Sequence, residues 1–179
     1  MSTPTTLVSV EEYLNTSYEP DRDYVDGVLV ERNVGTPEHS RLQAILVIYF
    51  ERFRKLHRLR TFPEARLLVD PLTKRHRVPD VLVLQGPYRK GKAITDVPVV
   101  TVEIKSPDDT LDDIIDRCFD YERLQVRHIL VLDPDHRRAW AFHQGSLQLL
   151  GGVSVSLDLP EFSIDFPFAQ LFAELDDED

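Results

Sequence analysis

The 179-residue chain has few of the residues that build several common kinds of functional site. Its single cysteine, Cys118, excludes an intramolecular disulfide and a zinc site made of several thiolates. Its seven glycines form no glycine-rich phosphate loop, no dinucleotide fingerprint and no GxSxG nucleophile elbow. No apolar run approaches the roughly 18 residues of a membrane span, and no secretory signal pattern is visible. We therefore expect a cytoplasmic protein without a membrane partner.

Charge is unevenly distributed along this acidic chain, whose formal net charge is −10. That balance argues against a nucleic-acid partner, because phosphate binding needs local positive potential. Between Arg52 and Lys92, however, twelve Lys and Arg residues face only three Asp and Glu residues. This basic segment is either a solvated helix face with its loops or a surface that faces phosphates.

Local patterns predict one α/β domain over 1–179, with a central mixed β-sheet flanked by helices. Residues 1–22 are expected to form an N-terminal helical extension, because Ser9 and Glu12 have the form of a capping box. Asp26-Gly27 is a turn dipeptide between apolar residues and predicts a hairpin. The acidic tail 175–179 is typical of a solvated chain end.

Two long helices and a series of strands are expected in the rest of the chain. Thr36-Pro37-Glu38 predicts the start of the first helix, since Thr is a good N-cap and Pro is tolerated in the first turn. Its apolar face is expected to hold Leu42, Ile45, Leu46, Tyr49, Phe53 and Leu56. The second helix is expected over 111–125, with an apolar set that includes Leu111 and Cys118. Strands are expected at 65–69, 78–84, 97–105, 128–132, 138–143 and 147–150, followed by a strand and a short helix within 162–174.

Two carboxylates and a lysine form the most informative chemical pattern. Side chains two apart on a strand share a face, so Glu103 and Lys105 are expected to point together. If 78–84 lies beside 97–105, Asp80 approaches Glu103. Two carboxylates held close together favour a cation between them, and hard oxygen ligands suit Mg²⁺ or Mn²⁺. A lysine alongside could activate a water for the hydrolysis of a phosphodiester.

The same residues also have ordinary structural interpretations. A Glu–Lys pair at i, i+2 on a strand is usually a surface ion pair worth less than about 1 kcal/mol. Pro79-Asp80 at the start of a strand is often only a turn feature. The order, spacing and strand context of these residues favour the metal site.

Several segments occur in the order of a known bacterial family. They are Asp23-Tyr24-Val25-Asp26-Gly27, Thr36-Pro37-Glu38-His39, Val78-Pro79-Asp80-Val81, Val102-Glu103-Ile104-Lys105-Ser106-Pro107 and, further on, Asp113, Arg117, Tyr121 and Val131-Leu132-Asp133-Pro134. On these residues the chain resembles the restriction endonuclease family of the PD-(D/E)XK nuclease superfamily, once a domain of unknown function, over roughly 23–142. The resemblance implies a restriction-endonuclease-like fold, a divalent metal, DNA as the substrate and a homodimer.

The resemblance also implies roles for the residues of the carboxylate motif. Asp80 and Glu103 match the metal-binding acids, and the main-chain carbonyl of Ile104 matches a further metal ligand. Lys105 matches the superfamily lysine, to which we assign activation of the water.

Other candidate residues lie outside that motif. Many family members place the lysine on the following helix, where this chain has Arg117. Arginine is a poor base, but its guanidinium binds phosphate or carboxylate well. Arg117 therefore has either a charge-stabilising role or an i, i+4 ion pair with Asp113. His39 could contact the scissile phosphate or metal-bound water, or be a structural hydrogen-bonding residue. Asp23 has a family-like position, with salt-bridge or turn roles as alternatives.

Together these interpretations predict a Mg²⁺- or Mn²⁺-dependent endonuclease that hydrolyses DNA, with the basic segment 52–58 and 74–77 on the DNA backbone. Two alternatives stay open. The first is a catalytically inert nucleic-acid-binding or regulatory module with the same fold, and the second is a dimeric interaction scaffold. Metal binding that depends on Asp80 would distinguish the enzyme from the inert module, and salt-sensitive retention on DNA would argue against the scaffold.

Overall fold

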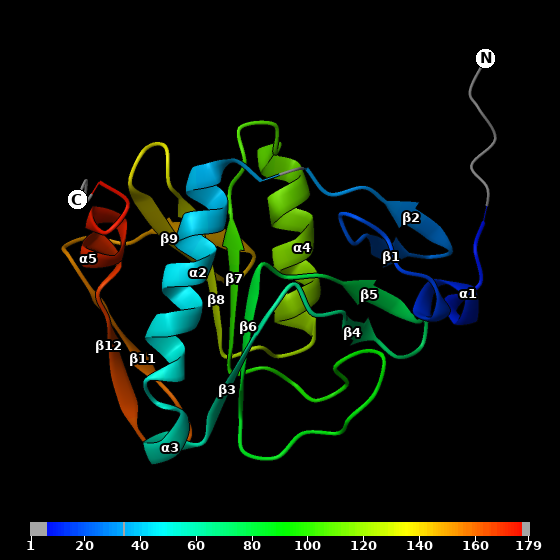
Figure 1. Cartoon of the computed structure of the whole chain (residues 1–179), viewed down its shortest axis with the longest axis horizontal. Coiled ribbons are helices and arrows are strands. Elements are labelled where there is room, and N and C mark those ends of the chain that lie inside the picture. The colour runs from blue at the N-terminus through cyan, green and yellow to red at the C-terminus, as the bar shows by residue number, and fades with distance from the viewer. Residues whose placement is uncertain (1–6, 34, 177–179) are drawn as a thin grey trace.

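A computed structural model describes residues 7–33 and 35–176, which fold around a six-stranded mixed sheet (Figure 1). The order of its strands is β10 (Ser146–Leu149), β9 (Arg138–His143), β8 (His128–Asp133), β7 (Val100–Ile104), β6 (Val81–Gln85) and β3 (Leu59–Pro63). β7 and β8 run parallel, and the other neighbouring strands run antiparallel. The parallel pair is joined through α4 (Leu111–Arg123), because parallel strands need a long crossover. The predicted α/β class with a central mixed sheet is confirmed.

Helices cover both faces of the sheet, with α2 (Pro37–Glu51) on one side and α4 on the other (Figure 1). The alternation of strand side chains divides the core into two layers. In β6, Val81 and Val83 pack with the α2 layer, whereas Leu82 and Leu84 pack with the α4 layer. The α2 layer is completed by β11 (Val155–Asp158), β12 (Ser163–Phe166) and α5 (Phe168–Ala173). Cys118 of α4 is fully buried and apolar in its surroundings.

A smaller sheet with the order β2-β1-β5-β4 lies beside this body, together with α1 (Val10–Asn15) (Figure 1). Its strands are β1 (Asp23–Val25), β2 (Val28–Val30), β4 (Leu67–Asp70) and β5 (Arg75–Arg77). The predicted hairpin is confirmed: Asp26 and Gly27 form its two-residue loop, with positive φ angles of 52° and 88°.

A buried ion-pair network ties the small sheet to α4. Arg77 contacts Asp23 at 3.0 Å and Asp120 at 2.7 Å, and Arg75 contacts Asp120 at 3.1 Å. Asp23 also accepts a hydrogen bond from the Val78 N–H. Asp23 therefore has the salt-bridge role, and Arg75 and Arg77 neutralise acids of the fold instead of presenting their charge at the surface.

The structure corrects the predicted elements at several places. The first long helix ends at Glu51, and a separate short helix, α3 (Arg54–His57), follows, so Leu56 is 78% exposed and does not belong to the core. Leu111 lies in the first turn of α4 and is 58% exposed. Strands β3, β5 and β11 were not predicted, because charged or polar residues interrupt their apolar alternation.

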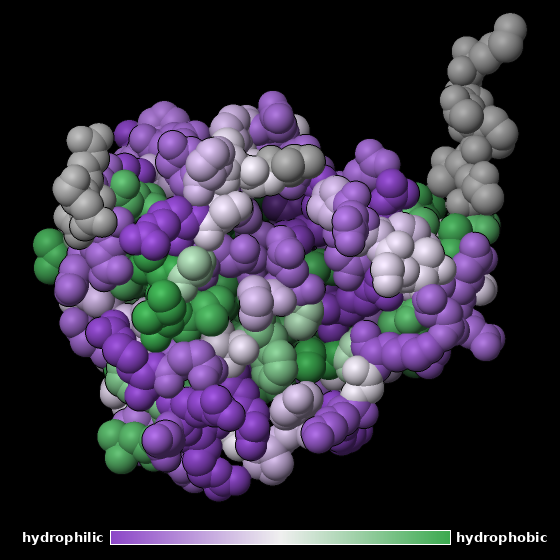
Figure 2. All heavy atoms as spheres, in the orientation of Figure 1, coloured by the Kyte–Doolittle hydropathy of each residue, from purple (hydrophilic) through white to green (hydrophobic). Residues whose placement is uncertain are grey.

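The surface shown in Figure 2 is largely hydrophilic, and apolar side chains gather over the α2 side of the molecule. Ile48 of α2 is one of the exposed apolar residues of the chain. In the part of the chain that the structure describes, no helix combines the length and the hydropathy needed to cross a membrane.

Candidate active site

Two buried carboxylates lie on neighbouring strands of the central sheet. β6 and β7 are antiparallel, and Val81 is opposite Val102. Continuing this register by one residue places Asp80 opposite Glu103, and opposite residues share a face of the sheet. Asp80 is 2% exposed and Glu103 is 1% exposed. The expected pairing of the two strands thus brings two acids, 23 positions apart in the chain, to one place in the core.

Each oxygen of the Asp80 carboxylate is held by a donor. Oδ1 lies 2.5 Å from Nη2 of Arg32 and 3.4 Å from Nε2 of His39, and Oδ2 accepts the Ile104 N–H at 2.6 Å. Burial alone would raise the pKa of Asp80, but Arg32, His39 and the Ile104 N–H outweigh it and lower that pKa below its usual range. Asp80 is therefore ionised in the fold.

Glu103 is held from the α4 side by two residues one helical turn apart. Its Oε1 accepts the Tyr121 hydroxyl at 2.6 Å, and its Oε2 lies 2.9 Å from Nε of Arg117. Burial raises the pKa of Glu103; Arg117 opposes this rise, and the charge of Asp80 adds to it. The net direction is upward, so the two acids are shifted in opposite directions, as expected when like charges share one site.

Arg117 pairs with acids other than the one expected from its own helix. It contacts Glu103 and lies 3.5 Å from Oδ1 of Asp109, whereas Asp113 accepts a hydrogen bond from the Thr110 hydroxyl at 2.5 Å. The i, i+4 pair with Asp113 is therefore not formed, and the charge-stabilising role stays a prediction.

The Lys105 ammonium is directed to a different acid from the two predicted. It lies 3.9 Å from Oδ2 of Asp133, at the end of β8, and its backbone N–H donates to the Leu132 carbonyl at 2.8 Å. Since β7 ends at Ile104, the rule that places alternate residues on one face does not extend to Lys105. The structure thus brings Asp80 and Glu103 together but pairs the lysine with Asp133.

A cavity of about 220 Å³ opens beside Asp80. Its lining includes Arg32, His39, Asp80, Ile104 and Arg117. Four of the residues predicted for the site, together with Arg32, therefore face one cavity. His39 lies in the first turn of α2, where its backbone N–H donates to the Oγ1 of the N-cap residue at 3.2 Å. Neither Glu103 nor Lys105 is among the residues that line this cavity.

Arg32 was not predicted as a site residue. It lies in the irregular segment between β2 and α2, where no periodicity or motif assigns a partner. Only the packing of that segment against the sheet brings its guanidinium to Asp80. Tyr121 belongs to the family-like pattern, but its hydrogen bond to Glu103 likewise depends on the packing of α4.

The donor set fits a divalent metal in part. Within residues 7–33 and 35–176, no three His, Cys, Asp or Glu side chains gather as a metal-binding group. Glu103 Oε2 is nevertheless a buried acceptor without a hydrogen bond, and Asp80 and Ile104 line the cavity. Mg²⁺ commonly binds one or two carboxylates and keeps several waters. Two carboxylates are therefore enough protein ligands of the type that Mg²⁺ prefers. A metal on Asp80 has to compete with Arg32.

The mixed sheet, its crossover helix and the pair of acids on adjacent antiparallel strands define an α/β protein of the restriction-endonuclease-like kind. The model of the Uma2 family, described as "Putative restriction endonuclease", matches residues 10–167, and the chain belongs to this family. The resemblance noted in the sequence is therefore confirmed.

Comparison with solved structures supports the same fold. A crystal structure from Anabaena variabilis ATCC 29413, of a protein described as a putative nuclease belonging to DUF820, aligns with a TM-score of 0.77 and 20% identity. The alignment covers 94% of this chain and 99% of the other. A comparison with curated proteins found no significant match.

Proposed function

We propose that this protein is a metal-dependent endonuclease that hydrolyses DNA phosphodiester bonds at Asp80 and Glu103. The observation that carries the proposal is the pair of buried carboxylates on neighbouring strands, one of which, Asp80, lines a cavity together with cationic side chains. Burying two acids so close together costs stability, a cost that functional sites often carry, and pKa values shifted in opposite directions are typical of functional groups. Family membership supports the same reaction class.

In this proposal Asp80 and Glu103 hold Mg²⁺ or Mn²⁺, and the carbonyl of Ile104 is a further oxygen ligand. The bound metal would lower the pKa of a water and stabilise negative charge on the phosphate. Arg117 is already beside Glu103 and lines the cavity, so it can bind a phosphate oxygen as the charge-stabilising group.

Two residues are candidates for handling the proton of the attacking water. Lys105 follows Glu103 by two positions, but it has to leave Asp133 to take this role. His39 already lines the cavity and lies beside Asp80. We propose Lys105 as the activating residue, as the superfamily pattern implies, with His39 orienting the water or the phosphate.

The direct test is incubation of supercoiled plasmid with the purified protein and Mg²⁺ or Mn²⁺. Asp80→Asn removes one metal-binding charge and is expected to abolish nicking. Glu161→Gln, which changes an exposed carboxylate outside this cavity, is the matched control and is expected to nick as the wild type does. Equal nicking by the Asp80→Asn and wild-type proteins would indicate a contaminant and refute the assignment.

A catalytically inert nucleic-acid-binding module is the second candidate function. One observation favours it: Arg32 and Arg117 pair directly with the two carboxylates and so provide their counter-charges. Isothermal titration with Mn²⁺ separates the two functions. A binding site that Asp80→Asn removes supports the enzyme, whereas absence of binding to the wild-type protein supports the inert module. The homodimer implied by the family is part of either proposal, and sedimentation analysis tests it.

A further inference from the structure

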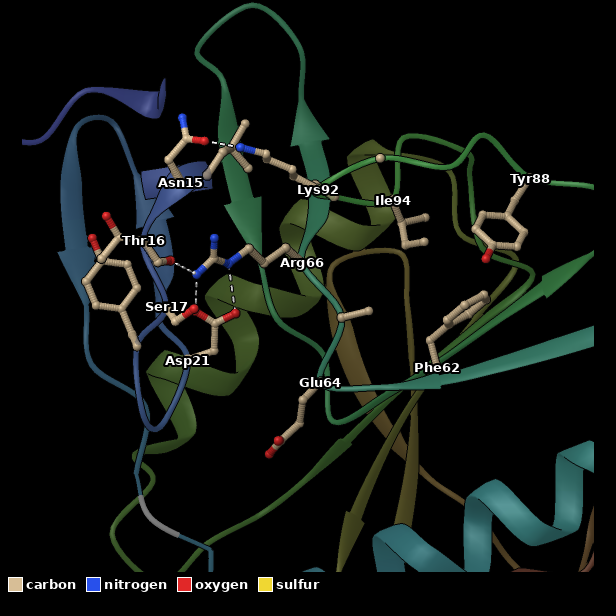
Figure 3. A pocket seen from close by; sticks show the side chains of 15 residues that line it. Asn15, Thr16, Ser17, Asp21, Phe62, Glu64, Arg66, Tyr88, Lys92 and Ile94 are labelled. Atoms are coloured by element: carbon tan, nitrogen blue, oxygen red, sulfur yellow. Dashed lines mark hydrogen bonds and ion pairs between the residues drawn. The ribbon is translucent and has the colours of Figure 1, made fainter. Parts of the chain in front are cut away.

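A second and larger cavity, of about 630 Å³, lies next to the candidate site (Figure 3). Its walls come from three parts of the chain that are distant in sequence: the end of α1 with the segment after it (14–21), the end of β3 with its connection to β4 (62–66), and the loop after β6 (88–94). In Figure 3, Phe62 and Tyr88 form one side of this cavity, and Arg66 and Asp21 form the opposite side.

The aromatic side offers ring surface to a planar ligand. The Phe62 and Tyr88 rings are 5.0 Å apart at an angle of 71°, and both side chains are only half-buried. The Arg60 guanidinium lies 5.8 Å from the centre of the Tyr88 ring, on which it can stack. Aromatic side chains in a positively charged setting are the platforms on which proteins stack unpaired bases.

The opposite side is a rigid wall whose charges are already matched. Arg66 donates to both oxygens of Asp21, at 2.8 and 2.7 Å, and to the carbonyls of Tyr13 and Thr16, at 2.7 and 2.8 Å. Because these bonds use Nε and both terminal nitrogens, Arg66 shapes the wall and is not the group that binds an anion.

Positive charge that a ligand can reach lies on the loop after β6. Lys90 and Lys92 are exposed on this loop, and Lys92 also lines the cavity. Lys92 donates to the side chain of Asn15, but an ammonium has three donors and can contact a phosphate as well. Phosphate contacts of this kind position a nucleic acid without reading its sequence.

Glu64 connects this cavity to the candidate active site. It lines both cavities, and its backbone N–H donates to the Asp80 carbonyl at 3.2 Å. Its side chain is exposed, and Figure 3 shows it extending below the two walls, on the side away from Phe62 and Tyr88. A free carboxylate accepts hydrogen bonds from the exocyclic amino group of a base.

We propose that this cavity binds one unpaired nucleotide of a single-stranded DNA segment. Its base stacks on the ring of Tyr88, which Phe62 supports edge-on, its amino group donates to Glu64, and its phosphate contacts Lys92. The neighbouring phosphodiester then lies at Asp80. A base inside a duplex is stacked and paired on its edge, so the cavity selects single-stranded, looped or flapped DNA. This inference rests on the proposed function, whose substrate it specifies.

The test is fluorescence anisotropy with an end-labelled single-stranded DNA of about 12 nucleotides, measured with EDTA so that cleavage does not occur. We expect the single strand to bind at least about tenfold more tightly than the blunt duplex of the same sequence. Tyr88→Ala is expected to weaken binding about 5- to 150-fold, the range for loss of one stacked base, whereas Tyr88→Phe keeps the ring and the affinity. Equal binding by Tyr88→Ala and wild type would overturn the proposal.

Lys92→Ala provides a second test at an exposed position, where the fold is not at risk. It is expected to weaken binding and to reduce the dependence of affinity on salt, while Lys92→Arg retains both. Duplex DNA that binds as tightly as the single strand, or a matching RNA that binds more tightly than the DNA, would also overturn the proposal. Circular dichroism confirms that each variant is folded.

These outcomes are separable from failure of the proposed function. If plasmid is not nicked but Tyr88→Ala still loses single-strand binding, the nucleotide cavity is supported and catalysis is not. If nicking depends on Asp80 but Tyr88→Ala binds normally, catalysis is supported and the nucleotide cavity is refuted.

Discussion

Replacing Arg32 by methionine tests how the two acids of the site are kept in the core. Arg32 Nη2 lies 2.5 Å from Asp80 Oδ1, and the two side chains are 11% and 3% exposed. Methionine keeps much of the length of the side chain but removes the charge. Asp80 would keep the Ile104 N–H and the contact with His39, yet it would lose its permanent counter-charge.

The expected loss follows from the burial of the pair. Breaking a buried ion pair by removing one partner typically costs about 3–5 kcal/mol, because the remaining charge stays buried. Since Asp80 retains other donors, we expect the lower part of this range, about 3 kcal/mol. For a chain of this length that corresponds to a fall in Tm of roughly 6–12 °C.

The same variant tests whether Arg32 competes with a metal. Without the guanidinium, Asp80 is free to bind Mn²⁺, so Arg32→Met is expected to bind it more tightly than the wild type does. A ligand present at about 100 times its Kd stabilises the fold by roughly 2.7 kcal/mol, which would restore most of the lost stability. Thermal unfolding with and without Mn²⁺ measures both effects.

A matched control is available in Arg22→Met. Arg22 pairs with Glu31 at 2.9 Å, but these side chains are 35% and 77% exposed, so the expected change is below about 1 kcal/mol. If Arg32→Met were as stable as this control without metal, the buried pair would not be what accommodates Asp80. If Mn²⁺ raised its Tm no more than that of the wild type, competition for Asp80 would be refuted.

Other perturbations follow from the same contacts. Arg77→Met leaves two buried acids that keep other partners, and denaturant unfolding should show a loss of about 3 kcal/mol; a loss below about 1 kcal/mol would contradict the buried network. Burial lowers the pKa of His76 and keeps it neutral in the fold, so its contribution to stability is complete above the unfolded pKa of about 6.5 and declines as pH falls below it. Urea unfolding at pH 5 and pH 8 should show that His76→Phe reduces this decline, and an unchanged decline would exclude His76 as its source. In the plasmid assay Lys105→Ala should abolish nicking and His39→Ala should slow it at least about tenfold; full activity of Lys105→Ala would move the water-activating role elsewhere.

The elements that could be predicted are those whose signals are local. Ser9 accepts the Glu12 N–H, Thr36 accepts the His39 N–H, and Asp26-Gly27 closes a two-residue hairpin, each as expected. These contacts join residues no more than three positions apart, so the chain contains all the information they need. The apolar run of β6 and the residue pattern of β7 predicted these strands for the same reason, and their pairing brought the two acids together.

The parts that could not be predicted depend on partners distant in the chain. The sequence does not distinguish the basic residues between Arg52 and Lys92 from one another. In the fold, however, Arg75 and Arg77 form ion pairs with Asp120, whereas Lys92 lines a cavity. The segment 52–58 follows α2 at the end opposite His39, roughly 20 Å away by the rise of the helix, so it does not border the two carboxylates.

The sequence by itself determined the α/β class, the two acids of the candidate site and the family to which the chain belongs, because strand alternation, caps and ordered motifs are properties of neighbouring residues. Only the tertiary structure decided which basic side chain pairs with which acid. Arg32 pairs with Asp80, Arg117 with Glu103, and Lys105 with Asp133. The physical reason is that an ion pair forms wherever packing brings opposite charges within about 4 Å, and that proximity is set by the arrangement of all the elements together.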